Sequence, residues 1–473
     1  MKEYRFLIDG RWLESSKKIE VKNPYNNETV GVVNAALEDA LEEAVVSSQK
    51  AFEVTRKLPV YKRAEILGKI ADGIKSRAEE IARIITVEAG KPIKDSRIEV
   101  SRAMNTFEIA KEEAKRVNGE VIPLDLMSGS ENRLGIVRRF PIGPILGVTP
   151  FNFPLNLVCH KVAPAIASGN TIILKPASKT PITAIMLGEI VTDAGFPPGG
   201  LNIIPCSGKA AERLVLDERI KKFTFTGSAQ VGLRLKNKAG MKKVTLELGG
   251  NAGVIIHKDT DIDLASRRCT TGAFSFAGQI CISVQRIYVH KDVYKNFIEK
   301  FIANVKGLKT GDPLDEGTDI GPMIDNDAIK RTEEWVKEAV RDGAKVLTGG
   351  EGSNPFFEPT VLTDVKPSMK VCSEEVFAPV VTVSRYEDFT EAVKSINDSK
   401  YGLQAGIFTN DVKNIFLAYN ELEVGGVIVN DIPTYRIDHM PYGGVKLSGC
   451  GREGIRYAID EMTEIKLLAL NLM

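Results

Sequence analysis

A cysteine closes the segment FSFAGQIC at residues 274–281. Free cysteines in soluble proteins are mostly buried and pack like small hydrophobic side chains. As a thiolate, however, Cys281 could add to a carbonyl carbon and later leave from a thioester. Cys281 is therefore a candidate nucleophile, and the other motifs must decide between the structural and the chemical interpretation.

Two further polar side chains suit the same reaction. Addition of a thiolate to a carbonyl group leaves negative charge on the oxygen, which the amide of Asn152 and the backbone N–H of Cys281 could stabilise. Glu247 ends an otherwise apolar strand beside two glycines, where burial raises a carboxyl pKa and suits the group to activate water. Taken singly, Asn152 is a turn residue and Glu247 a paired surface carboxylate. From these residues alone, both the structural and the chemical interpretation stay open.

The composition of the 473-residue chain favours a small-molecule partner. Its 63 Lys and Arg residues nearly balance 62 Asp and Glu residues without a basic block, so we expect binding to neither nucleic acid nor membrane. The six cysteines show no CxxC spacing and the four histidines are not paired at metal-ligand spacing, so no metal site is predicted. The N-terminal segment MKEYRFLIDGRW is polar and no apolar run is long enough to span a bilayer, which predicts a cytoplasmic protein.

The elements that must position these residues alternate between helices and strands. Apolar residues at helical spacing predict amphipathic helices over residues 36–52, 61–90 and 93–117. β-branched runs bounded by turn residues predict strands at 170–175, 201–205, 221–227 and 243–250. Helices are predicted between them at 180–195 and 228–240. This alternation predicts an α/β fold with a doubly wound, Rossmann-like sheet whose ligands bind at the carboxyl ends of its strands. The same alternation of strand and helix patterns after residue 250 predicts a second α/β domain.

One literal GxGxxG match, GCGREG at 449–454, does not predict a dinucleotide site. Too few residues follow it to form a βαβ unit. If the earlier sheet binds a dinucleotide, the FTGS turn at 225–228 offers backbone amides and a serine hydroxyl to the pyrophosphate. By itself, that turn indicates only a helix N-cap.

Seven motifs occur in an order that carries a family resemblance. They are PFNFP at 150–154, LKPAS at 174–178, FTGS at 225–228, LELGGN at 246–251, GQIC at 278–281, EEVFAP at 374–379 and PYGGVKLSGCGRE at 441–453. This series closely resembles the aldehyde dehydrogenase superfamily, whose members oxidise aldehydes with NAD(P) through a cysteine thioester. The resemblance covers nearly the whole chain, from IDGRW near its start to GRE near its end.

The resemblance implies roles for four catalytic residues. Cys281 would be the nucleophile, Asn152 an oxyanion donor and Glu247 the general base of thioester hydrolysis. Lys161, in CHKVAPA, matches a family lysine near the catalytic centre, although an ordinary salt-bridged lysine would look the same in sequence.

The resemblance also implies NADP or NAD as the coenzyme. Lys175 would contact the adenine-ribose hydroxyls, Glu375 the nicotinamide ribose, and Phe377 the nicotinamide ring. Ser178 stands where many members carry a glutamate whose charge would repel the 2′-phosphate, so NADP is favoured, with dual use as the alternative. The full set of predicted coenzyme residues is Phe151, Asn152, Lys175, Pro176, Ala177, Ser178, Gly227, Ser228, Leu248, Glu375 and Phe377.

The residues expected in the substrate tunnel are more polar than a fatty aldehyde would favour. We therefore predict a short polar aldehyde of the lactaldehyde, glyceraldehyde or succinic semialdehyde type. The predicted substrate residues are Asn156, Leu157, His160, Ser275, Ile280, Ile282, Arg436 and His439.

The resemblance divides the chain into three parts. Residues 1–122 and 142–249 would form the coenzyme-binding domain, residues 250–453 the catalytic domain, and residues 123–141 and 454–473 a small β oligomerisation element. In the last, ENRLGIVRRF would pair with TEIKLLALNL, whose apolar face is a liability if left exposed. A homodimer or homotetramer is expected.

Three alternatives differ in chemistry. A coenzyme A-acylating relative would transfer the thioester to a thiol and commonly lacks the glutamate of LELGG, so Glu247 argues against it. A glyceraldehyde-3-phosphate enzyme would be expected to carry arginine where this chain has Ile280. A catalytically silent binding protein has no need of Cys281, Asn152 and Glu247 together.

Overall fold

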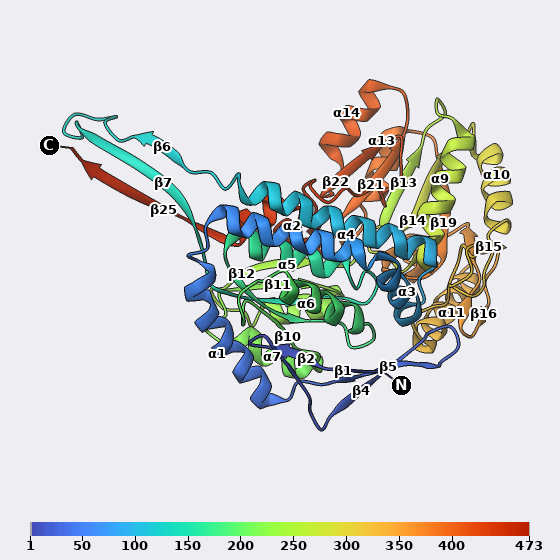
Figure 1. Cartoon of the computed structure of the whole chain (residues 1–473). Helices are drawn as coiled ribbons and strands as arrows, with labels where there is room; N and C mark the ends of the chain where they lie inside the picture. Colours follow the sequence, from blue (N-terminus) through green and yellow to red (C-terminus); the bar gives the residue numbers. More distant parts are fainter. Residues whose placement is uncertain (1, 473) are drawn as a thin grey trace.

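The computed structural model describes residues 2–472 and shows two α/β units side by side, with a three-stranded arm extending from one of them (Figure 1). The first unit is built on an eight-stranded sheet. Its central five strands are parallel, in the order β12 (Lys243–Glu247), β11 (Lys222–Thr226), β8 (Pro144–Val148), β9 (Thr171–Lys175) and β10 (Leu201–Ile203). At the edges, β24 (Gly449–Cys450) pairs antiparallel with β12, and β2 (Phe6–Ile8) and β3 (Arg11–Leu13) continue beyond β10.

Helices cover both faces of this sheet. Alternate strand residues such as Ile172 and Ile173 enter different hydrophobic cores, because successive strand side chains point to opposite faces. One core is formed with α2 (Val60–Ser76), α3 (Ala78–Ala89), α4 (Ile93–Ala114), α5 (Asn156–Ser168) and α6 (Ile182–Asp193). The other is formed with α1 (Glu38–Thr55), α7 (Gly208–Leu216) and α8 (Ala229–Lys236). The predicted doubly wound sheet is confirmed.

One predicted helix is two. The stretch 61–90 is divided between α2 and α3 at Arg77, whose backbone has φ −109° and ψ 17°. The Arg77 side chain donates hydrogen bonds to Glu80 on α3 and to Glu189 on α6. Apolar periodicity continues through this break because both helices bury the same face against α4 and α6.

The second unit contains a seven-stranded sheet. Its strands follow the order β15 (Lys345–Thr348), β18 (Thr360–Thr363), β19 (Val380–Tyr386), β14 (Val284–His290), β13 (Ala252–Ile256), β21 (Gln404–Phe408) and β22 (Gly426–Val429). All neighbours are parallel except β15 with β18. One core is formed with α9 (Ile262–Phe274), α10 (Tyr294–Lys306) and α11 (Asn326–Arg341), and another with α13 (Phe389–Asn397) and α14 (Val412–Glu421).

Smaller elements complete these two units. A three-stranded sheet near the N-terminus joins β1 (Glu3–Tyr4), β5 (Thr29–Asn34) and β4 (Lys18–Lys22). Two short pairs are β16 (Gly352–Ser353) with β17 (Phe356–Phe357) and β20 (Tyr401–Gly402) with β23 (Val445–Lys446). The remaining helices among the described residues are α12 (Lys370–Ser373), α15 (Ile455–Glu461) and a 3-10 turn at Ser275–Gly278. α15 packs on α5 and α4.

The arm is the sheet of β6 (Glu120–Pro123), β7 (Arg133–Pro141) and β25 (Thr463–Asn471) (Figure 1). β25 pairs antiparallel with β7 over its whole length, from Thr463 opposite Pro141 to Asn471 opposite Arg133. The predicted pairing of these two segments is confirmed, whereas the domain boundaries remain a prediction. Within residues 2–472, the helices are all too short or too polar to cross a bilayer.

Candidate active site

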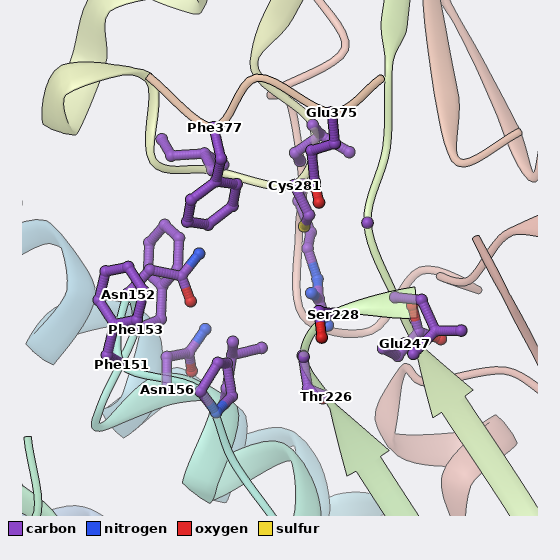
Figure 2. Close-up of a pocket in the computed structure, with 18 of the residues that line it drawn as sticks. Phe151, Asn152, Phe153, Asn156, Thr226, Ser228, Glu247, Cys281, Glu375 and Phe377 are labelled. Carbon is purple, nitrogen blue, oxygen red and sulfur yellow. The ribbon is translucent and has the colours of Figure 1, made fainter. Parts of the chain in front are cut away.

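Residues of both units line a cavity of about 320 Å³, and Figure 2 shows their side chains. It is bounded by the carboxyl ends of β11 and β12, the start of α5, the turn before β14, and a loop of the second unit. Parallel strands present ligand sites at this end, because their following turns converge there. The predicted residues that line the cavity are Phe151, Asn152, Asn156, Leu157, Gly227, Ser228, Glu247, Leu248, Ile280, Cys281, Ile282, Glu375, Phe377 and Arg436.

The turn before Cys281 has an uncommon backbone. Phe276 and Ala277 have positive φ angles of 48° and 52°, and Gly278 follows at 67°. Non-glycine residues rarely adopt this left-handed conformation, and such strain clusters at functional sites. A Cβ on Gly278 would lie 2.2 Å from the carbonyl oxygen of Ala378, so only glycine fits. The turn ends α9 abruptly and brings Cys281 to the cavity.

Cys281 is half-buried, and its thiol contacts Tyr442. Burial raises the pKa of the thiol to about 11, although the hydrogen bond with Tyr442 acts in the opposite direction. Thiolate formation therefore depends on hydrogen-bond donors and cations near the sulfur.

Asn152 lies beside the nucleophile's own loop. Its Nδ2 donates to the carbonyl oxygen of Gln279 at 2.9 Å, two residues before Cys281. A side-chain amide has two N–H donors, so the second remains for an oxygen in the cavity. Asn152 Oδ1 is buried and has no hydrogen-bond partner among the described residues. The amide is thus held in orientation by one bond and can donate another.

Glu247 ends β12 and is only 3% exposed. Neither carboxyl oxygen has a hydrogen-bond partner within residues 2–472. Burial, and next the nearby Glu453, raise the pKa of Glu247 well above its ordinary value. A Cβ at Gly443 would lie 2.7 Å from Glu247 Oε1, so glycine there leaves room for the carboxyl group. A buried carboxyl with free oxygens can exchange a proton with a water molecule.

Lys161 is buried behind the cavity rather than lining it. Its Nζ donates to Glu453 Oε1 at 2.9 Å and to Thr226 Oγ1 at 2.8 Å. Arg436 donates to the other oxygen of Glu453 at 3.1 Å. Burial acts to raise the pKa of Glu453, but Lys161 and Arg436 outweigh it and lower this pKa to about 2. Glu453 therefore stays ionised between two cations.

The predicted coenzyme residues divide between the cavity and the sheet edge beside it. Glu375 accepts a hydrogen bond from Gly250 N at 3.0 Å, and burial raises its pKa to about 7. A Cβ at Gly249 would lie 2.3 Å from Glu375, so glycine permits this approach. Phe377 packs edge-on against Phe151, with ring centroids 5.9 Å apart.

Lys175 ends β9, is nearly buried, and has a pKa lowered by burial. Ser178 is exposed and lies outside the cavity, as do Pro176 and Ala177. The neighbouring Lys179 forms an ion pair with Asp325. These residues fit a dinucleotide that extends from the cavity along the carboxyl ends of the strands. The groups concerned are the Glu375 carboxyl, the Phe151–Phe377 pair and Lys175.

Three predicted substrate residues do not line the cavity. His160 is buried, and its Nε2 is 2.8 Å from Asp438 Oδ1. Ser275 donates from Oγ to the carbonyl oxygen of Thr271 at 2.8 Å. His439 is exposed beside the buried Asp438. Asn156 and His160 lie on one face of α5, as helical periodicity predicts. Asn156 lines the cavity, whereas the His160 ring contacts Asp438 and does not extend to the cavity.

Several cavity residues escaped the sequence analysis. Tyr442 lines the cavity, whereas Glu453 does not line it but accepts hydrogen bonds from Lys161 and Arg436. Both belong to the PYGGVKLSGCGRE motif, so motif membership was an available signal. Arg102 lines the cavity from α4, a helix whose pattern indicates only an amphipathic core element. Arg331 lines it from α11. No local feature distinguishes these two arginines from surface residues.

A doubly wound sheet that faces a second α/β unit across a cavity with a cysteine suits a dinucleotide-dependent enzyme, and the family model and relatives place the chain in the NAD(P)-dependent oxidoreductase class. The chain belongs to the aldehyde dehydrogenase family, since the sequence model of that family matches residues 12–468.

Curated relatives cover the whole chain. A 3-sulfolactaldehyde dehydrogenase from Priestia aryabhattai is 47% identical, over 100% of this chain and 99% of its own length. A lactaldehyde dehydrogenase from Methanococcus aeolicus is 41% identical, over 98% of this chain and 99% of its own length.

Solved structures agree. Aldehyde dehydrogenase 21 from Physcomitrella patens, in complex with the reaction product succinate, has a TM-score of 0.98 and 46% identity, covering 100% of this chain and 98% of that one. The glyceraldehyde-3-phosphate dehydrogenase GapN from Methanocaldococcus jannaschii, complexed with NADP, has a TM-score of 0.93 and 41% identity, covering 97% and 100%.

Proposed function

We propose that this protein oxidises a short polar aldehyde that carries an anionic group to its carboxylic acid, with NADP favoured over NAD. The observation that carries the proposal is the pair of arginines, Arg102 and Arg436, that line the cavity beside Cys281. Guanidinium groups suit carboxylate, sulfonate and phosphate, because they donate in a planar fork.

The charges around the cavity support an anionic substrate. Glu453 is shared by Lys161 and Arg436, and Asp438 pairs with Arg102, so two carboxylates face three cations. Burial, and next the nearby Glu453, raise the pKa of Glu247 and so disfavour its charged form. Within this cluster the cations outnumber the carboxylates by one, and an anionic substituent would neutralise the excess charge.

The names of the relatives agree with this chemistry. Sulfolactaldehyde carries a sulfonate, and succinate, which the Physcomitrella patens structure contains, carries a second carboxylate. Lactaldehyde is the smaller, uncharged member of the same series. Succinic semialdehyde and sulfolactaldehyde are accordingly our first candidates, with lactaldehyde and glyceraldehyde next.

In the proposed mechanism, the Cys281 thiolate adds to the aldehyde carbon. The resulting oxyanion accepts hydrogen bonds from the second N–H of Asn152 and from the backbone N–H of Cys281. The coenzyme, when bound, supplies the hydride acceptor that converts the adduct to a thioester. Glu247 then removes a proton from water, whose oxygen bonds to the thioester carbon as the carbon–sulfur bond breaks and the thiolate returns.

The coenzyme preference rests on Ser178. A glutamate at this position would accept hydrogen bonds from the ribose hydroxyls and repel a 2′-phosphate, whereas serine can donate to the phosphate. Lys175 adds positive charge at the same strand edge. The GapN structure complexed with NADP is consistent with this preference.

We also propose that the arm joins copies of the chain. Ile465, Leu467 and Leu468 on β25 are 64%, 51% and 54% exposed. Ile465 and Leu467 lie on one face of the strand and Leu468 on the other, and apolar surface exposed to this extent is covered in stable assemblies. A homodimer or homotetramer would cover it, and sedimentation of the wild type beside a Leu468→Asp variant would test this assignment.

The experiment that tests the proposed function is an aldehyde panel. Succinic semialdehyde, sulfolactaldehyde, glyceraldehyde, lactaldehyde and hexanal are compared by kcat/KM from the absorbance of the reduced coenzyme. We expect the two anionic aldehydes to give the highest values. A maximum at hexanal would contradict the proposal, and absence of turnover with all five would favour a silent binding protein.

A further inference from the structure

Tyr442 places a hydroxyl group directly on the candidate nucleophile. Its phenolic oxygen is 3.2 Å from Cys281 Sγ, and the tyrosine is only 3% exposed. Among the described residues, Tyr442 is the hydrogen-bond partner of the Cys281 sulfur. Tyr442 has no assigned role in the chemistry set out above.

The surroundings hold the tyrosine in this position. The guanidinium carbon of Arg436 lies 3.6 Å from the centre of the Tyr442 ring, as in a cation–π contact. The backbone of Tyr442 exchanges two hydrogen bonds with Glu453, at 3.0 Å and 2.7 Å. Ile282 and Leu403 pack around the ring. The hydroxyl is therefore fixed by contacts on the ring and on the backbone.

The direction of the hydrogen bond follows from the ionisation of both partners. Burial raises the pKa of Tyr442 well above its ordinary value, which favours the protonated phenol. A thiolate has no proton to donate. Once Cys281 is ionised, the tyrosine O–H must be the donor and the sulfur the acceptor.

The charged groups near Cys281 act on its sulfur without a direct hydrogen bond. The carboxyl groups of Glu375 and Glu247 face the sulfur and disfavour a thiolate, while Arg436 favours it. Arg436 contacts the tyrosine ring and donates to Glu453, and no hydrogen bond from it to the sulfur occurs within residues 2–472. The Arg436 cation therefore acts on the thiolate across the Tyr442 ring, whereas the Tyr442 hydroxyl contacts the sulfur directly.

We propose that Tyr442 is a catalytic residue that donates a hydrogen bond to the Cys281 thiolate. The bond stabilises the ionised nucleophile before it attacks the aldehyde and again when hydrolysis releases it. This inference rests on the proposed role of Cys281 as the nucleophile, and it adds a role for a second side chain. The tyrosine hydroxyl, rather than the aromatic ring, must set the acidity of the thiol.

The test is Tyr442→Phe, which removes one oxygen and keeps the ring under Arg436. Alkylation of Cys281 by iodoacetamide is followed over a pH series by mass spectrometry of the peptide that carries it. We expect the midpoint of the pH profile to rise and the rate near neutral pH to fall about tenfold, as is typical for loss of a hydrogen bond to a charged group. At high pH the rates of variant and wild type should converge.

Tyr435→Phe is the matched control, because Tyr435 lies in the same loop and is 44% exposed. Its alkylation profile should match that of the wild type. An unchanged or lowered midpoint in Tyr442→Phe would overturn the proposal. If Tyr442→Phe does not fold, wild-type protein labelled with fluorotyrosine replaces it: the more acidic phenol should lower the midpoint, and no shift would again overturn the proposal.

A separate measurement tests the premise. Cys281→Ser retaining dehydrogenase activity would refute the proposed function itself, whatever the alkylation profile of Tyr442→Phe. Conversely, an inactive Cys281→Ser with an unchanged profile in Tyr442→Phe would leave the nucleophile assigned and remove only the role of the tyrosine.

Discussion

Arg102 on α4 donates hydrogen bonds to both oxygens of Asp438, from Nη2 at 2.7 Å and from Nε at 3.3 Å, across 336 residues of sequence. Asp438 also accepts the contact of His160. Burial acts to raise the pKa of Asp438, but His160 and Arg102 outweigh it and lower this pKa. The ionised aspartate holds Arg102 at the cavity and joins α4 to the loop that carries Arg436.

Arg102→Gln should weaken the use of anionic aldehydes. A hydrogen bond to a charged group contributes about 1.5–3 kcal/mol, so kcat/KM for succinic semialdehyde should fall about tenfold or more. The value for uncharged glyceraldehyde should change little. Lys111→Gln, on the solvent side of the same helix, serves as the control. Equal losses for both aldehydes would mean that Arg102 supports the fold and does not select the substrate.

Cys281→Ser should abolish dehydrogenase activity and leave coenzyme binding intact. A serine hydroxyl is not ionised near neutral pH and does not form the thioester. Coenzyme binding is measured by quenching of protein fluorescence, and turnover by absorbance of the reduced coenzyme. Turnover at the wild-type rate would remove the thioester mechanism.

Glu247→Gln should separate the two halves of the reaction. The first turnover needs no base for water, so the burst of reduced coenzyme should persist while steady turnover slows. Because the pKa of Glu247 is raised by burial, wild-type steady turnover should increase as the pH rises through that pKa and the carboxyl loses its proton. The variant should lack this increase. Rapid-mixing kinetics across a pH series measure both phases, and equal loss of burst and steady rate would contradict the assignment.

Ser178→Glu should shift the coenzyme preference toward NAD. The introduced carboxylate would repel the 2′-phosphate of NADP and accept hydrogen bonds from the ribose hydroxyls of NAD. The measurement is kcat/KM for both coenzymes with one aldehyde. A wild-type preference for NAD of about tenfold or more, equivalent to roughly 1.4 kcal/mol, would defeat the predicted preference for NADP.

Lys91→Met should destabilise the protein strongly. Lys91 and Glu99 form an ion pair whose side chains are 1% and 0% exposed, and the ammonium group also lies over the rings of Phe153 and Phe276. Removing one partner leaves a buried charge unpaired, which costs about 3–5 kcal/mol. Urea unfolding measures the change. The double variant with Glu99→Gln should recover part of the loss, and equal stability of the single and double variants would show that the ion pair is not the source.

The sequence was sufficient for the features that depend on a local pattern of residues or on the order of motifs along the chain. The order of the motifs predicted Cys281, Glu247 and Asn152 as one site, and all three line the same cavity. Alternating strand and helix patterns predicted the doubly wound sheet, since burial on both faces requires continuous apolar strands. The apolar alternation of the C-terminal segment likewise predicted β25.

The partners of the charged side chains required the folded chain. Lys161 meets Glu453 across 292 residues, and Tyr442 meets Cys281 across 161. His160 contacts Asp438 and does not line the cavity, because a buried imidazole needs a polar partner and the neighbouring loop provides one. Such contacts depend on how segments far apart in the sequence pack against one another. The residues that flank a side chain in the sequence do not show which group lies opposite it in the folded chain.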